Sequence, residues 1–479
     1  MVFACLSPAE DIVRPPEAAD TFVPQCEEEI REYLKNRLPF FVTTVCRRWR
    51  TSAMSAEWLW ARWSIVIDLP AEEVLTLLDR FVSRSLKWSG KYPLEFSLLI
   101  DPLGVRFNLM AYFEYKNTSS LWRIINKLAL EQKRWQKATF RMSHEVNGSQ
   151  FEGYHNWDEQ EDVNKFLLLR TDDLLLLEEL DLECIAAVDK SPSHGFVTTT
   201  LPFPRLRRVS IKEHKMKRPP CQIQIADMER MVSGDRLEAL SLRICHEEDP
   251  WNPAVANLFP LVLSKLRFLS IESYTYTGRS GPAFEQYLLN SLTCPSLTSL
   301  QLWDITVEEL QLCISFVYRS SPPLQALEIK MVPDSPVDDR VKNDAFISFL
   351  ERLPLLTTFR LRFYHPHEIA SLLDALSSSD EAGTTLKLVP LLKVIEIGQA
   401  EAPVEMFGKL IPSRWNIHPS RRRLHSVTLL ACSEVIGDLP LFTDQDMSPR
   451  WSPYNIETCV AEGLSFFCAP SINYQDMDE

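Results

Sequence analysis

The sequence predicts an α/β fold in which short parallel strands alternate with helices and each unit packs on its neighbours. Three observations lead to this prediction. A six-residue apolar pattern returns at nearly constant spacing, amphipathic segments lie between its copies, and proline stands shortly before many of them. A small helical segment, rich in aromatic and basic residues, precedes the repeats.

The repeated pattern is apolar-x-x-apolar-x-apolar. Its nine copies are LEELDL at Leu177, LRRVSI at Leu206, LEALSL at Leu237, LRFLSI at Leu266, LTSLQL at Leu297, LQALEI at Leu324, LTTFRL at Leu356, LKVIEI at Leu392 and LHSVTL at Leu424. The intervals between them are 29, 31, 29, 31, 27, 32, 36 and 32 residues. A weaker copy, WQKATF, begins at Trp135. Nine copies at this spacing indicate an internal structural repeat rather than chance.

Each copy has the pattern of a short strand. Side chains alternate along a strand, so the fourth and sixth positions point to one side, and the first position closes the turn into the strand. Proline cannot continue a helix and leaves the preceding residue extended, so it marks the junction from helix to strand. The prolines ahead of the copies are Pro204, Pro295, Pro322, Pro323, Pro354 and Pro390.

Amphipathic segments between the copies predict helices. One apolar stripe comprises Ala345, Phe346, Phe349, Leu350 and Leu353, and another Ile369, Leu372, Leu373 and Leu376. Strand, loop, helix and proline in units of this length are the plan of a leucine-rich-repeat solenoid, with parallel strands on the concave side and helices outside. The repeat consensus places Asn or Cys three positions after the sixth residue, and here only Cys245 and Cys432 fit. An α/β solenoid with uneven helices that follows the horseshoe only loosely is the alternative.

Four regions are expected along the chain. We expect a flexible lead at 1–25, a helical module at 26–66, an irregular solenoid with a C-terminal cap at 67–468, and an acidic tail at 469–479. The segments EEVLTLLDRFVSRSLKW and SLWRIINKLALEQKRW should pack onto the first repeats. NIETCVAEGLSFFC should form a last helix and strand, since a solenoid must cover its final apolar edge.

The composition favours a soluble intracellular protein, in the cytoplasm, the nucleus or both. The net charge of −14, from 65 acidic and 51 basic residues, argues against a nucleic-acid partner. We find no secretory signal and no apolar stretch long enough to span a membrane, so no membrane partner is expected. The eleven cysteines contain no CxxC pair, which favours reduced thiols over a disulfide framework or a zinc site.

Catalytic and cofactor motifs are not found, so the chain is predicted not to be an enzyme and to need no cofactor or metal. His365, His367 and Glu368 are the nearest approach to a metal-ligand cluster, but they more plausibly begin a helix and cap its amides. The acidic run His246–Asp249 is interpreted as a solvated loop.

Aromatic residues directly follow several copies of the pattern, where strands leave the sheet. They are Tyr274, Tyr276, Trp303, Phe363 and Tyr364. Aromatic side chains at such positions could form a rim that binds a target protein, because they give a large contact area. Ordinary loop packing explains them equally well.

The segment TVCRRWRTSAMSAEWLW, residues 44–60, carries three arginines and three tryptophans. Val45, Trp49 and Ala53 recur at four-residue steps and should form one helical stripe, with the arginines off that stripe and solvated. Leu59 and Trp60 follow as a second apolar anchor. Because so small a unit buries little core alone, it should pack on another surface.

VCRRWR followed by LW resembles the second half of an F-box, the helical module that docks the Skp1 adaptor of SCF ubiquitin ligases. The similarity extends over most of residues 38–468 and includes VLTLLDRFVSRSLKWSGKYPLEFSLLI, LTCPSLTSLQL and SRWNIHPSRRRLHSVTLLACSE, which resemble the F-box and leucine-rich-repeat proteins of mushroom-forming (basidiomycete) fungi. The resemblance implies that Val45, Trp49, Leu59 and Trp60 belong to the F-box core and its Skp1-facing edge. It also implies that the repeats recruit a target protein, whose identity it does not give.

Two functions follow from the resemblance. The chain is a non-catalytic substrate receptor of an SCF-type ubiquitin ligase, or it is a stand-alone repeat scaffold whose F-box remnant only caps the first repeat. An F-box usually opens with an LPxEIL-like helix, and LSPAEDIV at 6–13 matches it poorly, so the F-box start is expected to be degenerate or truncated.

Overall fold

The computed structural model describes residues 46–67, 72–100, 118–142, 174–183, 203–212, 236–245, 261–274, 284–331, 339–379, 386–415, 424–430, 432, 453 and 455–469. The chain divides into two compact units, Met1–Leu128 and Ala129–Glu479, here called unit 1 and unit 2. The expected flexible lead at 1–25, the opening segment at 6–13, Val45 and residues 470–479 of the expected tail lie outside the described residues.

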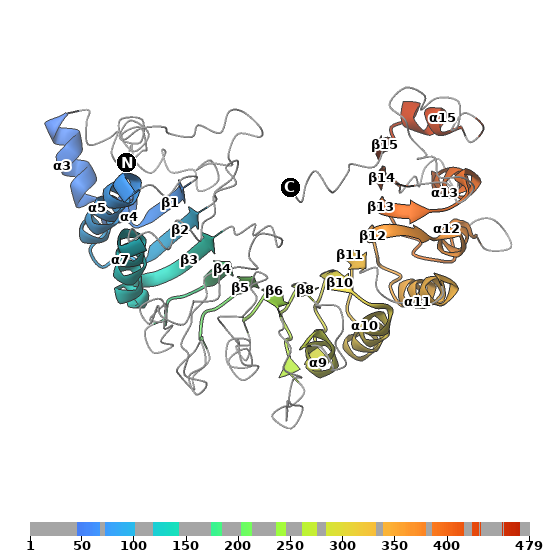
Figure 1. The fold of residues 1–479 in the computed structure, drawn as a ribbon, viewed down its shortest axis with the longest axis horizontal. Coiled ribbons are helices and arrows are strands. Elements are labelled where there is room, and N and C mark those ends of the chain that lie inside the picture. Colours follow the sequence, from blue (N-terminus) through green and yellow to red (C-terminus); the bar gives the residue numbers. More distant parts are fainter. Residues whose placement is uncertain are drawn as a thin grey trace, which may run out of the picture. The chain divides into compact units, whose positions relative to one another are not determined.

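Unit 1 joins helices to a pair of parallel strands (Figure 1). Its elements are α3 (Arg47–Ser55), α4 (Glu57–Trp60), β1 (Arg62–Ile67), α5 (Glu72–Trp88), β2 (Leu94–Ile100) and most of α7 (Thr118–Leu130). The segment EEVLTLLDRFVSRSLKW forms the helix α5. Trp63 of β1 packs against Phe81 of α5 and Phe96 of β2, with ring centroids 6.0 and 5.2 Å apart. Through these contacts the helix α5 packs as one layer on the layer formed by β1 and β2.

Unit 2 is built on one large sheet whose neighbouring strands are all parallel. In spatial order they are β3 (Trp135–Met142), β4 (Glu179–Glu183), β5 (Arg208–Lys212), β6 (Ala239–Cys245), β8 (Phe268–Tyr274), β10 (Ser299–Ile305), β11 (Ala326–Met331), β12 (Thr358–Glu368), β13 (Val394–Glu401), β14 (Ser426–Leu430) and β15 (Ser465–Ala469). The nine copies of the repeat supply β4 to β14, and the weaker copy at Trp135 supplies β3. The predicted parallel α/β fold is therefore confirmed.

The described helices of unit 2 lie along one side of this sheet, and the opposite side carries none of them (Figure 1). They are η2 (Gln132–Arg134), α9 (Phe284–Ser291), α10 (Val307–Ser320), α11 (Asp339–Glu351), α12 (Ala370–Ser377), α13 (Val404–Trp415) and α15 (Ile456–Ala461). A separate two-stranded pairing joins β7 (Leu261–Val262) to β9 (Leu292–Thr293). The expected closing helix and strand are confirmed as α15 and β15.

A ladder of backbone hydrogen bonds proves that the copies are structurally equivalent. The N–H of the second residue in each copy donates to the C=O of the second residue in the copy before it. For example, Arg207 donates to Glu178 at 2.8 Å, Glu238 to Arg207 at 2.7 Å, and His425 to Lys393 at 2.7 Å. The same backbone hydrogen bond therefore joins each copy of the repeat to the next.

A turn precedes many of the strands. The N–H of the first apolar residue bonds the carbonyl three residues earlier, as Leu297 does to Cys294 at 3.2 Å and Leu356 to Leu353 at 3.1 Å. The first residue of every copy is buried. Its burial therefore closes the turn into the strand, as predicted.

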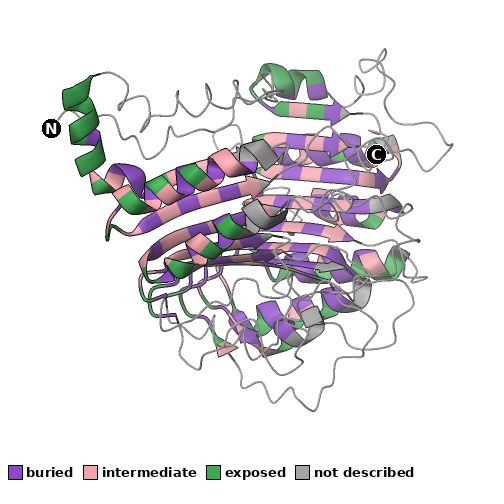
Figure 2. Ribbon diagram, turned by 60° about the vertical axis from the view of Figure 1, so that its left-hand side comes forward, coloured by how far each residue is buried: buried purple, intermediate pink, exposed green. Residues whose placement is uncertain are grey.

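Burial along the strands follows the pattern. The fourth and sixth positions are buried, and Figure 2 shows buried and less buried residues alternating along the strands. Both predicted helical stripes are buried, in α11 and its following turn and at the start of α12. Apolar burial of this kind contributes about 25 cal/mol per Å² and is the main term that holds the layers together.

Two arginines tie consecutive helices to each other. Arg319, near the end of α10, donates to the carbonyls of Leu289 and Leu292. Arg414, near the end of α13, is 4 % exposed and donates to three carbonyls, those of Leu376, Leu388 and Val389. A helix end leaves carbonyls without partners, and Arg319 satisfies such carbonyls at the end of α9 and Arg414 one at the end of α12. The other two carbonyls bound by Arg414 lie in the segment before β13.

One local expectation was wrong. His365, His367 and Glu368 were expected to begin a helix, but they complete the long strand β12, and α12 begins at Ala370. A carboxylate oxygen of Glu368 still accepts the Ala370 N–H at 2.5 Å, so the expected capping bond exists. Cys432, which occupies the consensus position, donates from its Sγ to the Ile397 carbonyl oxygen at 3.6 Å.

Candidate protein-interaction surfaces

The apolar anchor of unit 1 is the indole of Trp60. It is 1 % exposed, and its Nε1–H donates to the Ala53 carbonyl at 2.6 Å. Its ring meets that of Trp88 in α5 edge-on, with centroids 4.4 Å apart. Leu59 is also buried in this cluster. Leu59 and Trp60 therefore pack within unit 1, where they fix α3 and α4 to α5.

Trp60 also begins a copy of the repeat that the sequence search did not find. In WARWSI, residues 60–65, Trp60 holds the first position, and Trp63 and Ile65 hold the fourth and sixth. The pairing register agrees, because Trp63 lies opposite Phe96 and Ile65 opposite Leu98 of β2. Tryptophan at both the first and fourth positions made this copy less similar to the leucine-rich pattern. The signal was present in the sequence.

Helix α3 presents almost all of its surface to solvent. Ala53 is its buried residue, and the other residues of Arg47–Ser55 are exposed (Figure 2). Trp49 was expected to pack on the same stripe as Ala53, yet it is 38 % exposed. Among the described residues, Ala53 packs in the apolar cluster with Leu59 and Trp60, and Trp49, one turn earlier, is not part of that cluster. Trp49 is therefore a surface aromatic residue on a helix anchored by its C-terminal end.

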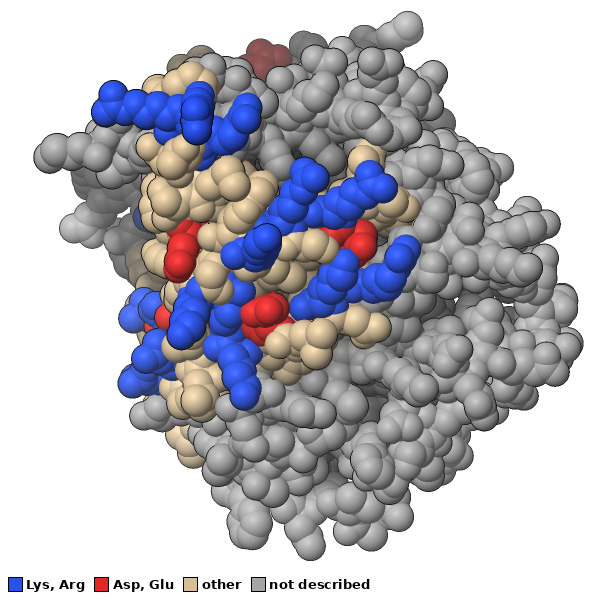
Figure 3. All heavy atoms as spheres, turned by 90° about the vertical axis from the view of Figure 1, so that its left-hand side faces the viewer, with Lys and Arg blue, Asp and Glu red and all other residues tan. Residues whose placement is uncertain are grey.

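Basic side chains gather on the face formed by α3, α5 and α7, although the whole chain carries a net charge of −14 (Figure 3). The exposed basic residues of these helices are Arg47, Arg48, Arg50, Arg80, Arg84, Lys87 and Arg123. Lys127 is engaged, because its Nζ donates to Asp79 at 2.6 Å and to Ser83 at 2.8 Å. Concentrated positive charge on an acidic chain favours a partner whose facing surface is acidic.

The sheet of unit 2 exposes a polar face on the side opposite the helices, and its charges are largely paired across strands. The ion pairs are Arg141–Asp181, Lys137–Glu179, Arg243–Glu272, Lys330–Asp304, Arg360 with Glu328 and Glu396, and Arg362–Glu396. Opposite charges at neighbouring strand positions stabilise the sheet. The pairing leaves this face polar but close to electrically balanced.

Trp303 is the predicted rim residue that best fits a binding role. It lies on the polar face of β10 and is half-buried, and its Nε1 is buried without an acceptor among the described residues. Asp304, next along the strand, has a φ of 61° where the register between β10 and β11 shifts. Such an irregularity re-aims the neighbouring side chain.

The other predicted rim residues divide into two groups. Phe363 is a correction, because it is 5 % exposed and packs edge-on against Phe346 of α11. It shares the buried side of β12 with Phe359 and Leu361, and the strand continues beyond it instead of leaving the sheet. Tyr274 and Tyr364 lie in β8 and β12, but their side chains fall outside the description, as does Tyr276 altogether. The five residues are therefore not shown to form one surface.

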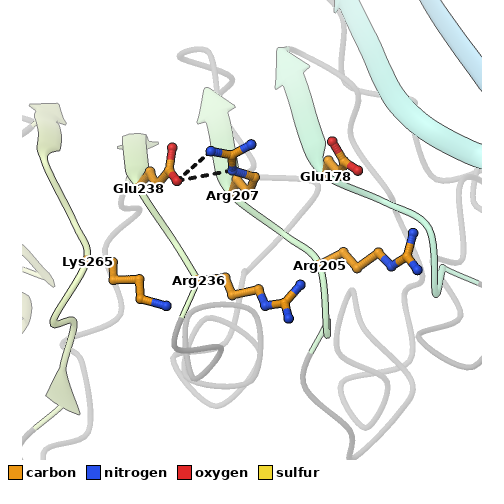
Figure 4. A pocket seen from close by; sticks show the side chains of 6 residues that line it. All are labelled: Glu178, Arg205, Arg207, Arg236, Glu238 and Lys265. Carbon is orange, nitrogen blue, oxygen red and sulfur yellow. Dashed lines mark hydrogen bonds and ion pairs between the residues drawn. The ribbon is translucent and has the colours of Figure 1, made fainter.

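A groove that the sequence reasoning missed lies at the edge of the sheet where β4, β5, β6 and β8 begin. It has a volume of about 480 Å³ and is lined by Glu178, Arg205, Arg207, Arg236, Glu238 and Lys265 (Figure 4). We call it the turn groove. Its lining comes from equivalent positions of consecutive repeats, so aligning the residue before each copy would have shown it.

Two rows of side chains line the turn groove. In one row the guanidinium of Arg207 donates twice to a carboxylate oxygen of Glu238, at 3.1 and 2.7 Å. This hydrogen bond is the largest cause that lowers the pKa of Glu238 and raises that of Arg207. The other row comprises Arg205, Arg236 and Lys265, each one residue before the first apolar position of its copy.

No three His, Cys, Asp or Glu side chains within the described ranges are arranged to hold a metal ion. Burial raises the pKa of the Cys294 and Cys432 thiols to about 12, so they behave as small apolar groups. None of the described helices has the length and hydropathy of a membrane span.

The geometry therefore offers three surfaces for other molecules: the basic face with α3, the polar face with Trp303, and the turn groove. Comparison with known proteins adds no assignment to any of them. The chain matches no family model and no curated protein sequence.

Proposed function

We propose that the chain is the non-catalytic substrate-recognition subunit of an SCF-type ubiquitin ligase, in which an F-box-like segment docks a Skp1-like adaptor and a leucine-rich-repeat solenoid binds a target protein. The observation that carries the proposal is helix α3. Its nine residues expose everything except Ala53, and its N-terminal half displays Trp49 among three arginines. An isolated helix of this length is marginal in water, so docking would stabilise it.

Anchoring at one end and exposure at the other suit an adaptor-docking element. Trp60 and Leu59 fix the base of α3 to α5, which orients the helix without using its outer surface. Exposed tryptophan and arginine are the residue types that dominate binding energy at protein interfaces. The basic surroundings would steer an acidic partner surface towards α3 and make its association sensitive to salt.

The repeats of unit 2 support the second half of the proposal. Parallel strands at one per repeat leave one face of the sheet clear of the described helices, and that face is polar and rigidly paired. Repeat proteins of this plan bind other proteins across such extended faces. Trp303, which is half-buried on this polar face, would be a contact there.

A stand-alone scaffold is the second candidate, and a different observation favours it. Trp60 occupies the first position of a repeat copy and is buried within unit 1. Capping of the first strand explains that burial without any adaptor. The two candidates therefore differ in what they require of Trp49, because adaptor docking uses its exposed ring and capping does not require it.

Titration of the purified full chain with a fungal Skp1-like adaptor tests the proposal. We expect binding by the wild type, and Trp49→Ala should weaken it at least about tenfold, the loss typical of an interface anchor. Tyr318→Ala is the matched control, since it removes another exposed aromatic ring (73 % exposed) on α10 and should change nothing. A folded wild type that fails to bind the adaptor at micromolar concentration would leave the scaffold as the function.

A further inference from the structure

We infer that the turn groove is a binding site for an extended acidic peptide segment. The inference extends the proposed function by naming the chemistry of the target, yet peptide binding requires no adaptor. The groove belongs entirely to unit 2, so its occupancy can be measured independently of the F-box-like segment. Failure of adaptor binding and failure of peptide binding are therefore separate results.

The first argument is the unbalanced charge. Four cations and two carboxylates line the groove. Glu238 is already engaged by Arg207, and Glu178 accepts from the Gln136 side-chain amide at 3.2 Å. Among the described residues, no carboxylate pairs with Arg205, Arg236 or Lys265, in contrast to the balanced polar face of the same sheet.

The second argument is that the row of cations is local. Arg205, Arg236 and Lys265 occupy the same turn position in three consecutive repeats. The residues at that position in the next four repeats are neutral: Ser296, Pro323, Leu355 and Leu391. Arg134 and Arg423 hold the same position before the copies at Trp135 and Leu424, but at least one copy with a neutral residue separates each of them from the three adjacent cations. The three adjacent turns therefore produce one positive strip across β5, β6 and β8.

The third argument is spacing. Neighbouring strands are about 4.8 Å apart, so the strip extends across roughly 10 Å. Side chains on one face of an extended peptide recur about every 7 Å, which brings two or three acidic side chains within reach of the flexible cations. Each contact is a charge-assisted hydrogen bond in a partly enclosed groove, stronger than a neutral one.

The lining also discriminates between classes of anionic ligand. Glu178 and Glu238 stand directly beside the cations and would repel a continuous phosphate backbone. A polypeptide has backbone N–H groups, and these carboxylates can accept hydrogen bonds from them. The mixed lining therefore favours an acidic peptide over a nucleic acid, in agreement with the acidic character of the whole chain.

Fluorescence anisotropy with the full chain tests the inference. The probe is a short labelled peptide in which glutamate alternates with serine, and its control has glutamine at every glutamate position. We expect the glutamate peptide alone to bind, with an affinity that falls as salt is raised. Arg205→Ala, Arg236→Ala and Lys265→Ala should each weaken binding about threefold, the size of a partly exposed charge contact, and the triple variant about 20-fold or more. Lys409→Ala, which removes an exposed lysine from α13, should leave binding unchanged.

A variant that binds more tightly is also needed, because a misfolded protein would not gain affinity. Glu178→Gln removes a repelling carboxylate from the groove and should tighten peptide binding about twofold. Equal binding of the glutamate and glutamine peptides would overturn the inference, as would equal losses in the Lys409→Ala and Lys265→Ala variants. Tighter binding of a single-stranded oligonucleotide than of the glutamate peptide would also overturn it.

Discussion

Replacement of Trp60 by alanine should destabilise unit 1 more than any change on the outer surface of α3. The indole is 1 % exposed, so Trp60→Ala removes a fully buried ring and leaves a cavity beside Trp88. Such truncations cost about 3–5 kcal/mol. The change also leaves the Ala53 carbonyl without its donor, which costs about 1 kcal/mol more.

The two contributions can be separated. Trp60→Phe keeps most of the apolar ring but removes the Nε1–H, so its loss should be about 1–2 kcal/mol. Urea unfolding followed by far-UV circular dichroism measures both variants through the midpoint of the first transition. Trp49→Ala is the control and should change the free energy of unfolding by less than about 1 kcal/mol, because its ring is 38 % exposed. Equal losses in Trp60→Ala and Trp49→Ala would refute the assignment of Trp60 as the anchor.

Three further predictions concern unit 2 and the thiols. Arg414→Met should lower the free energy of unfolding by about 3–5 kcal/mol, because three buried carbonyls lose their donor. Arg414→Lys should lower it by less, and thermal denaturation of the two variants measures the difference. Alkylation of the native chain near neutral pH should label the exposed Cys46 well before Cys294 and Cys432, because burial raises the pKa of the latter two thiols. Peptide mass spectrometry measures the labelling of each cysteine, and equal rates would contradict the burial of Cys294 and Cys432. Thr306→Ala removes the capping box at the start of α10 and should cost about 1 kcal/mol, whereas Thr306→Ser should be nearly neutral in the same thermal assay.

The repeat could be predicted from sequence because it depends on local rules. Alternation of buried side chains and proline before the strand act within a few residues, and all nine predicted copies form strands. The copy at Trp60 was not predicted, although its tryptophan fills the same buried first position as Trp135 does in the copy WQKATF.

Errors arose where length or tertiary packing decides the outcome. Phe363 was expected at a strand end, but β12 continues to Glu368 and turns its ring towards α11. Trp49 lies on the same helical stripe as Ala53, but the apolar periodicity of a helix does not show how many of its turns contact the neighbouring surface. The turn groove depends on pairing between residues about 30 positions apart, which brings Arg205, Arg236 and Lys265 into one row.

Hydrogen–deuterium exchange of the full chain, with and without a Skp1-like adaptor, tests the central claim most directly. If α3 is the docking element, the amides of Arg47–Ser55 should exchange more slowly when the adaptor is present, and those of β10 to β13 should be unchanged. Unchanged exchange across Arg47–Ser55 at saturating adaptor would contradict the claim and favour a scaffold capped by Trp60.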